Sequence, residues 1–223
     1  MTTAGQSIPN PREVSSAPTA TVHPGTVLVV WDHGGLQLRD DLGEILYVSL
    51  YDYRFDIFDG AGHVAIVRLR SLNGEPAVDL TLTDNARLAA SHLERRARMR
   101  RLVAGHARPA QFVKSESRDT LKYRVEGSDL AMEFEWSGLG RPIFMTGLHP
   151  QQADIDVFGQ VREASQFRAA VNGRVVPGSA FSNEVYTPWL GRPLHSAAVT
   201  IGEVLIAREG SDPVALWTQG HRR

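Results

Sequence analysis

The 223-residue sequence contains no cysteine. Disulfides, thiolate metal sites, iron–sulfur clusters and a cysteine nucleophile are therefore excluded. The lack of disulfides fits a reducing compartment. Also missing is any apolar run near the roughly 18 to 20 residues that a membrane-spanning helix requires. The first 25 residues lack the basic segment and apolar core of a secretory signal. We therefore expect a cytoplasmic protein without membrane insertion.

The sequence also has no large excess of either positive or negative charge. The 24 Lys and Arg residues nearly balance the 25 Asp and Glu residues, which leaves a formal net charge of −1. A near-neutral chain has no electrostatic reason to bind nucleic acid or an anionic membrane surface. Apolar residues make up 42% and charged residues 22%, a balance typical of a globular core. The sequence leaves the oligomeric state open.

Alternation of apolar and polar residues with a period of two dominates the chain from residue 26 onward. Gly and Asn-Gly turn signals separate these segments, which recur roughly every 8 to 15 residues, a spacing typical of a β-barrel or sandwich. The helices that a parallel α/β sheet needs between its strands are absent. The predicted strands span residues 26–31, 44–58, 63–70, 77–83, 111–116, 120–126, 130–136, 143–148, 152–161, 166–171, 197–208 and 214–217.

Three dipeptides and one glycine-rich stretch predict turns. Asn172-Gly173 and Asn73-Gly74 favour two-residue hairpins of type I′, and Asp59-Gly60 begins another turn. Residues 32–35 read Asp-His-Gly-Gly, which combines a turn-capping Asp with two conformationally free glycines. We expect a loop there rather than a catalytic Asp-His pair.

Residues 84–104 interrupt the strand pattern and predict one helix. Asp84 or Asn85 is a suitable N-cap, and an apolar stripe follows at helical spacing. Between residues 87 and 101 the segment also carries six arginines. We expect a solvated basic face. The alternative is a docking surface for a partner protein.

The domain boundaries follow from composition and strand spacing. Residues 1–24 are rich in Pro, Ser, Thr and Ala and predict a flexible arm. Residues 25–145 and 146–223 are interpreted as two β halves, the second carrying the candidate site. A single curved barrel fits the strand spacing nearly as well.

Familiar cofactor and catalytic motifs are missing. The sequence has no G-x-S-x-G elbow, no P-loop and no G-x-G-x-x-G after a strand. Its eight histidines show neither H-x-H nor H-x-x-x-H spacing, so we expect no metal. We also expect no cofactor.

Polar and aromatic side chains are densest just after the Asn172-Gly173 turn. An acid among aromatic rings has a raised pKa and serves as a proton donor, which is the role we assign to Glu184. Tyr186 would orient a carbonyl or share the proton. Ring stacking and oxyanion binding would fall to the substrate-binding residues of this corner, which are Phe181, Trp189, Arg192 and His195. A purely structural role, with a salt bridge between Glu184 and Arg192 and a core position for Trp189, remains the alternative.

A second candidate set lies on earlier strands whose side chains can face the same cavity. Asp52 is its proposed acid, and its other members are Tyr53, Glu135, Trp136 and His149. The aromatic face of residues 47–57, which includes Tyr53, is expected to belong to the core.

The corner sequence from Gly178 to Arg192, GSAFSNEVYTPWLGR, resembles that of lipocalin-like carotenoid 1,2-hydratases, AttH-type proteins and decalin-forming Diels-Alderases. Glu184 stands where that family usually has Asp, and two residues separate Tyr186 from Trp189. The resemblance implies a lipocalin-like antiparallel barrel. It also implies a hydrophobic polyene, polyketide or terpenoid substrate in natural-product biosynthesis.

Two functions follow. The first is a cofactor-independent enzyme that cyclises its substrate, catalyses a [4+2] cycloaddition, or hydrates a double bond with Glu184 or Asp52 as the acid. The second is a non-catalytic protein that binds an apolar small molecule in the same cavity.

Overall fold

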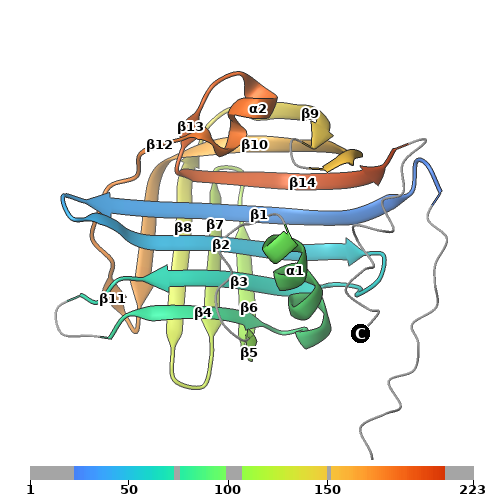
Figure 1. Ribbon diagram of the computed structural model, residues 1–223. Coiled ribbons are helices and arrows are strands. Elements are labelled where there is room, and N and C mark those ends of the chain that lie inside the picture. Colours follow the sequence, from blue (N-terminus) through green and yellow to red (C-terminus); the bar gives the residue numbers. More distant parts are fainter. Residues whose placement is uncertain (1–22, 73–75, 99–106, 150–151, 209–223) are drawn as a thin grey trace, which may run out of the picture.

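The computed structural model describes residues 23–72, 76–98, 107–149 and 152–208. Strands dominate this part of the chain (Figure 1). They are β1 (Val27–Asp40), β2 (Gly43–Asp56), β3 (Gly62–Leu69), β4 (Val78–Thr83), β5 (Ala107–Pro109), β6 (Gln111–Glu116), β7 (Thr120–Glu126), β8 (Ala131–Leu139), β9 (Ile143–His149), β10 (Gln152–Val171), β11 (Arg174–Val175), β12 (Ser182–Asn183), β13 (Leu194–His195) and β14 (Ala197–Ala207). The helical elements are α1 (Ala86–Arg98), the short α2 (Thr187–Leu190) and one 3-10 turn, η1 (Glu184–Tyr186).

Most of the strands belong to one sheet with the order β5-β4-β3-β2-β1-β14-β10-β8-β7-β6. Strands β9 and β11 pair with β10 beside this path, and β12 and β13 form a separate ribbon. Neighbours are antiparallel except β4 and β5, which run parallel. The predicted all-β barrel is confirmed.

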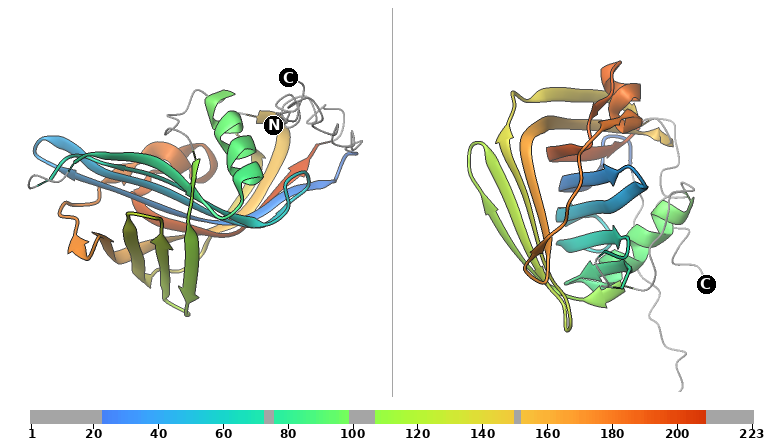
Figure 2. Two further views of the ribbon diagram at one scale, coloured as in Figure 1. Left: turned by 90° about the horizontal axis from the view of Figure 1, so that it is seen from below. Right: turned by 90° about the vertical axis from the view of Figure 1, so that its left-hand side faces the viewer.

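The long strand β10 turns the sheet back on itself. Its residues 155–163 pair with β14, whereas residues 164–171 pair with β8. The first wall therefore holds β1 to β5, β14 and the start of β10, and the second wall holds β6 to β8 and the end of β10. Figure 2 shows the two walls facing each other as a nearly closed barrel.

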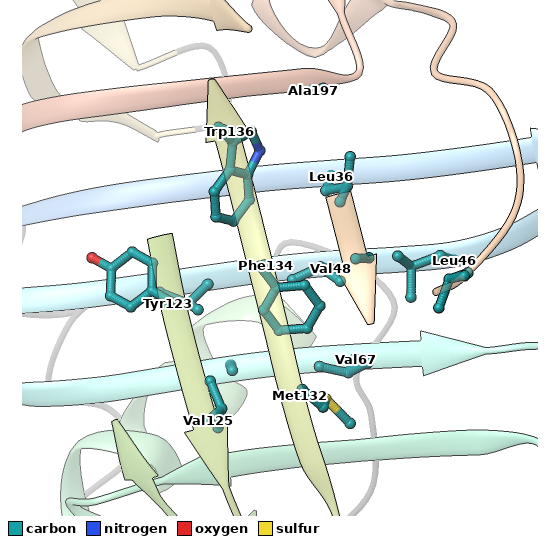
Figure 3. Packing of buried hydrophobic residues seen from close by; sticks show 14 of the residues in the cluster. Leu36, Leu46, Val48, Val67, Tyr123, Val125, Met132, Phe134, Trp136 and Ala197 are labelled. Atoms are coloured by element: carbon teal, nitrogen blue, oxygen red, sulfur yellow. The ribbon is translucent and has the colours of Figure 1, made fainter. Parts of the chain in front are cut away.

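The space between the walls is filled by apolar side chains. Leu46, Val48 and Val67 of the first wall meet Phe134 and Trp136 of the second (Figure 3), and all five are at most 1% exposed. Period-two alternation places each of these residues on the inward face of its strand. The middle of the barrel is thus a packed core.

The outer face of the first wall carries a second core. Helix α1 packs on β3, β4 and β5, and its Leu88 is fully buried. Tyr51 and Tyr53 project to this side and are buried in the same cluster as Tyr186. The aromatic face of β2 is therefore a core face, as expected, but it lies outside the barrel.

Residues 32–35 continue β1 instead of forming the expected loop. His33 pairs with Tyr51 on one side and Thr200 on the other. A Cβ atom on Gly34 would lie 2.8 Å from the Trp136 ring, and the Trp136 indole donates a hydrogen bond to the Gly35 carbonyl at 2.9 Å. Close packing against tryptophan, rather than a turn, requires the glycine at position 34.

Two local predictions are confirmed. Asn172 and Gly173 have φ values of 49° and 78°, as a type I′ turn demands, and they join β10 to β11. The Asn85 side chain caps α1 by accepting a hydrogen bond from the Leu88 amide at 3.1 Å.

The basic face of α1 departs from its prediction. Arg87 is exposed, but Arg95 and Arg96 are only 5% and 4% exposed, so the segment is not simply a solvated face. Tertiary packing against the polar rings of β2 draws these two arginines inward.

Strands from both sides of the expected 145/146 boundary pair within the one sheet, since β14 lies between β1 and β10. The Asn73-Gly74 turn, the strand at 214–217, the end of the predicted helix and nearly all of the expected arm lie outside the described residues. No helix of the described part is long and apolar enough to cross a membrane.

Candidate functional site

A cleft of about 520 Å³ opens where the ends of several strands meet at one end of the barrel. We call it the barrel-mouth cleft. It lies between the β3–β4 connection, the start of β8 and the β10–β11 hairpin, where the two walls separate. Its described lining consists of Leu69, Leu72, Pro76, Ala77, Val78, Asp79, Leu80, Arg108, Asp129, Leu130, Val171, Asn172, Arg174, Val175, Val176 and Pro177.

The cleft continues into a neighbouring hollow of about 210 Å³. The two share Leu80, Arg108, Asp129 and Leu130. Together they form an elongated depression along the edge of β4 and the β7–β8 turn. Clefts of a few hundred Å³ are the size that small-molecule sites usually have.

The lining of the barrel-mouth cleft is mainly aliphatic. Val78, Leu80, Leu130 and Val171 are only partly buried, although they pack against the barrel core. Charges lie among them: Asp79 pairs with Arg68 at 3.4 Å, and Asp129, Arg108 and Arg174 also line the cleft.

The predicted corner after the Asn-Gly turn does not line this cleft. Glu184 is exposed, and its carboxylate accepts a hydrogen bond from the Thr187 hydroxyl at 2.5 Å. The apolar surroundings expected for Glu184 are therefore not present. Arg192 is exposed as well and pairs with Glu163 at 3.4 Å instead of Glu184. Nothing is described of the Trp189 side chain.

Other corner residues lie inward. The Phe181 ring is covered by the Arg39 guanidinium at 3.6 Å from its centroid. Tyr186 is buried, and its hydroxyl lies 3.1 Å from that of Thr200. Tyr186 and His195 both line a cavity of about 60 Å³ on the outer face of the first wall. The structure thus brings these two predicted residues together, away from the barrel interior.

Residues of the second predicted set lie apart from one another. Tyr53 is buried under α1, where its hydroxyl is 2.6 Å from His92 Nδ1. Trp136 is fully buried in the barrel core, and Glu135 pairs with Lys122 at 3.0 Å. His149 ends β9, and its side chain is not described.

Asp52 belongs to a polar network. Its carboxylate receives hydrogen bonds from Lys114 Nζ at 3.0 Å and the Tyr123 hydroxyl at 3.2 Å, and His63 Nε2 lies 3.5 Å away. Lys114 also binds Asp32 at 2.6 Å. This network joins β1, β2, β6 and β7 across the two walls.

Hydrogen bonding fixes the charges in this network. Burial alone would raise the pKa of Asp32, but hydrogen bonds from Lys114, the Gly202 amide and Arg54 outweigh it and hold the pKa below its usual range. Burial would lower the pKa of Lys114, yet its bonds to Asp32 and Asp52 raise it above the ordinary value. Lys114 is therefore a structural cation and not a free amine nucleophile.

Sequence reasoning missed the barrel-mouth cleft, Lys114 and the buried arginines of α1. The alternation of Val78 and Leu80 with polar residues indicates that both face inward. It does not reveal that the two walls of the barrel separate at this place. Lys114 occupies an ordinary alternating strand, and nothing in its neighbourhood along the chain indicates that it pairs with Asp32 and Asp52. These features depend on which strands face one another.

No protein-family model and no curated protein matches the chain. Solved structures similar to it include an acetoacetate decarboxylase at 12% identity and a TM-score of 0.45, which covers 88% of this chain and 93% of that one. Another is the acetoacetate decarboxylase of Legionella pneumophila, at 9% identity and a TM-score of 0.44, covering 91% and 90%. At these values the likeness does not bear on function.

Proposed function

We propose that the protein binds an elongated apolar small molecule, of the polyene, polyketide or terpenoid kind, in the barrel-mouth cleft. The observation that carries the proposal is the aliphatic lining of a cleft of about 520 Å³ that extends into a second hollow. Burying apolar surface contributes roughly 25 cal/mol per Å², so an apolar chain laid along this depression gains affinity without ionic contacts. The resemblance to lipocalin-like proteins supports the same class of ligand.

Catalysis is a second candidate for the same cleft. A cycloaddition is accelerated largely by holding the substrate in a reactive geometry, and a shaped aliphatic surface can supply that. Hydration requires an acid. Glu184 is exposed outside the cleft, and Asp52 is bonded to Lys114 and Tyr123. The geometry therefore favours cyclisation over hydration as the enzymatic alternative.

Leu130→Arg tests the proposal. Leu130 lines both hollows, and an arginine there places a charge in the path of an apolar ligand. We expect the neutral dye Nile red to bind the wild type saturably, with a blue-shifted emission, and its affinity to fall about tenfold or more in the variant, equivalent to about 1.4 kcal/mol.

The matched control is Leu42→Arg, at a residue that is 85% exposed in the β1–β2 turn. Both variants should keep a cooperative thermal transition. Equal Nile red affinity in Leu130→Arg and Leu42→Arg, or no saturable binding to the wild type, contradicts the proposal. Conversion of a bound polyene, followed by mass spectrometry, separates an enzyme from a binding protein.

A further inference from the structure

The guanidinium of Arg96 is buried among neutral hydroxyl groups. Arg96 is 4% exposed, and among the described residues no Asp or Glu forms an ion pair with its guanidinium. The next residue, Arg95, is equally buried but pairs with Asp56 at 3.1 Å. Arginine does not lose its proton in proteins, and a buried charge is normally paired. Within the described part of the chain, Arg96 is therefore a buried cation without a counterion.

Neutral oxygens of β2 hold Arg96 in place. It donates hydrogen bonds to the hydroxyls of Tyr51 at 2.8 Å, Tyr47 at 2.7 Å and Ser49 at 3.5 Å. These bonds use three of its five N–H groups, and its Nε is buried with no hydrogen-bond partner. The Tyr47 and Tyr51 hydroxyls that accept from Arg96 each keep an O–H to donate. The Ser49 hydroxyl is also hydrogen-bonded to His33 Nε2 at 3.0 Å.

The cavity of about 60 Å³ adjoins this guanidinium. Arg96 lines it from α1, His33, Tyr51 and Ser49 from the sheet, and Tyr186 and His195 from the corner. The Nδ1 atom of His195 is buried without a hydrogen-bond partner. The buried guanidinium of Arg96 and the unpartnered Nδ1 atom of His195 thus both border a space large enough for a few non-hydrogen atoms.

We propose that this cavity is a binding site for a small carboxylate, held by Arg96 and the hydroxyls around it. Guanidinium groups bind planar carboxylates through two parallel N–H donors, and Nε–H is available for one of them. A single negative charge balances the single buried cation, whereas a phosphate dianion would leave an excess charge in the interior. The site lies on the opposite face of the first wall from the barrel-mouth cleft and does not depend on it.

Acetate is the probe for this site. We expect saturable shifts of the His33 and His195 ring signals in NMR when acetate replaces chloride at constant ionic strength. At a tenfold excess of acetate over its Kd, the melting temperature should rise by about 3 to 6 °C. Arg96→Met should abolish both effects.

Arg95→Met is the matched control, because it removes an equally buried arginine that has a carboxylate partner. Without acetate, Arg96→Met should melt at or above the wild-type temperature, because it removes an unpaired buried charge. Arg95→Met should melt well below the wild-type temperature, because it leaves the buried carboxylate of Asp56 without its ion-pair partner. Tyr47→Phe keeps Arg96 and should weaken acetate binding several-fold, which tests the site even if Arg96→Met fails to fold.

Three results overturn the proposal. The first is the absence of any acetate effect beyond that of chloride in the wild type. The second is an unchanged acetate affinity in both Arg96→Met and Tyr47→Phe. The third is tighter binding of inorganic phosphate than of acetate, which would assign the site to a different anion. Nile red binding is independent of Arg96, so failure here leaves the apolar-ligand proposal intact.

Discussion

Asp32 combines deep burial with a full set of hydrogen-bond donors. It is 2% exposed and bonds to Lys114 at 2.6 Å, to Arg54 at 2.5 Å and to the Gly202 amide at 2.8 Å. These partners lie on β6, β2 and β14, so one carboxylate ties the second wall to the first. Removing it leaves Lys114 and Arg54 without this shared anion.

We expect Asp32→Asn to lower the free energy of unfolding at pH 7 by about 3 kcal/mol. Because the folded-state pKa of Asp32 lies below its usual value, the stabilisation is present above the unfolded-state pKa and is lost as the pH falls through the folded-state pKa. The difference between wild type and variant in urea unfolding should therefore shrink below about pH 4.

Asp41→Asn serves as the control, because Asp41 is exposed in the β1–β2 turn. It should change the free energy of unfolding by less than about 0.5 kcal/mol across the same pH range. A difference between wild type and Asp32→Asn that stays constant from pH 7 to pH 3 would show that Asp32 acts through its shape and not its charge.

At the scale of the element, α1 depends on the residue that precedes it. Asn85 caps the helix through its carbonyl oxygen, and its amide donates to the backbone oxygens of Asp59 at 3.1 Å and Ala61 at 3.0 Å. The same side chain therefore starts the helix and fastens it to the turn after β2. Helix α1 in turn carries Arg96 to the proposed carboxylate site.

Asn85→Ala should lower the free energy of unfolding by about 2 kcal/mol, because it removes the cap and both amide donors. Asn85→Ser keeps an oxygen that can cap but lacks the amide, so its loss should be about half as large. Urea unfolding followed by circular dichroism measures both. Equal losses in the two variants would mean that the cap itself contributes nothing.

At the scale of the whole molecule, β14 unites the two ends of the chain. It pairs with β1 through residues such as Val199 with Gly34, and with β10 through Leu205 with Val157. Strand β10 then continues into the second wall. Neither half of the chain contains a complete wall without the other.

We therefore predict a single cooperative unfolding transition for the full chain. Calorimetric and van't Hoff enthalpies should agree, and residues 25–145 expressed alone should show no cooperative transition. Two resolved transitions, or cooperative melting of the 25–145 fragment, would instead support two independent β halves.

Local patterns in the sequence predicted the local structure well. Phe134 and Trp136 alternate with polar residues, so their shared face followed from the period of two. Asn172-Gly173 and Asn85 act through their own backbone neighbours, and both were placed correctly. The Asp32–Gly35 stretch was wrongly predicted to be a loop. Gly34 is required by close packing against Trp136, which lies more than a hundred residues away in the sequence.

The candidate sites show the same division. Tyr186 and His195 were identified by their density of polar and aromatic groups, and they do line a cavity. Glu184, chosen by the same criterion, is exposed, because the density of residue types does not reveal which side of a turn faces inward. Arg96 was expected on a solvated face and is buried against Tyr47 and Tyr51.

The sequence by itself determined most of the strands, the Asn-Gly hairpin and the one long helix, because each depends on residues a few positions apart. Tertiary structure alone decided where the walls separate into a cleft, which arginine is buried against hydroxyls and not a carboxylate of the described residues, and which corner residues face a cavity. Those outcomes depend on pairings between distant strands, such as β1 with β14 and β10 with both walls. Which side chains are buried, and which charges have a counterion, follows from that pairing of distant strands and cannot be read from any single stretch of the chain.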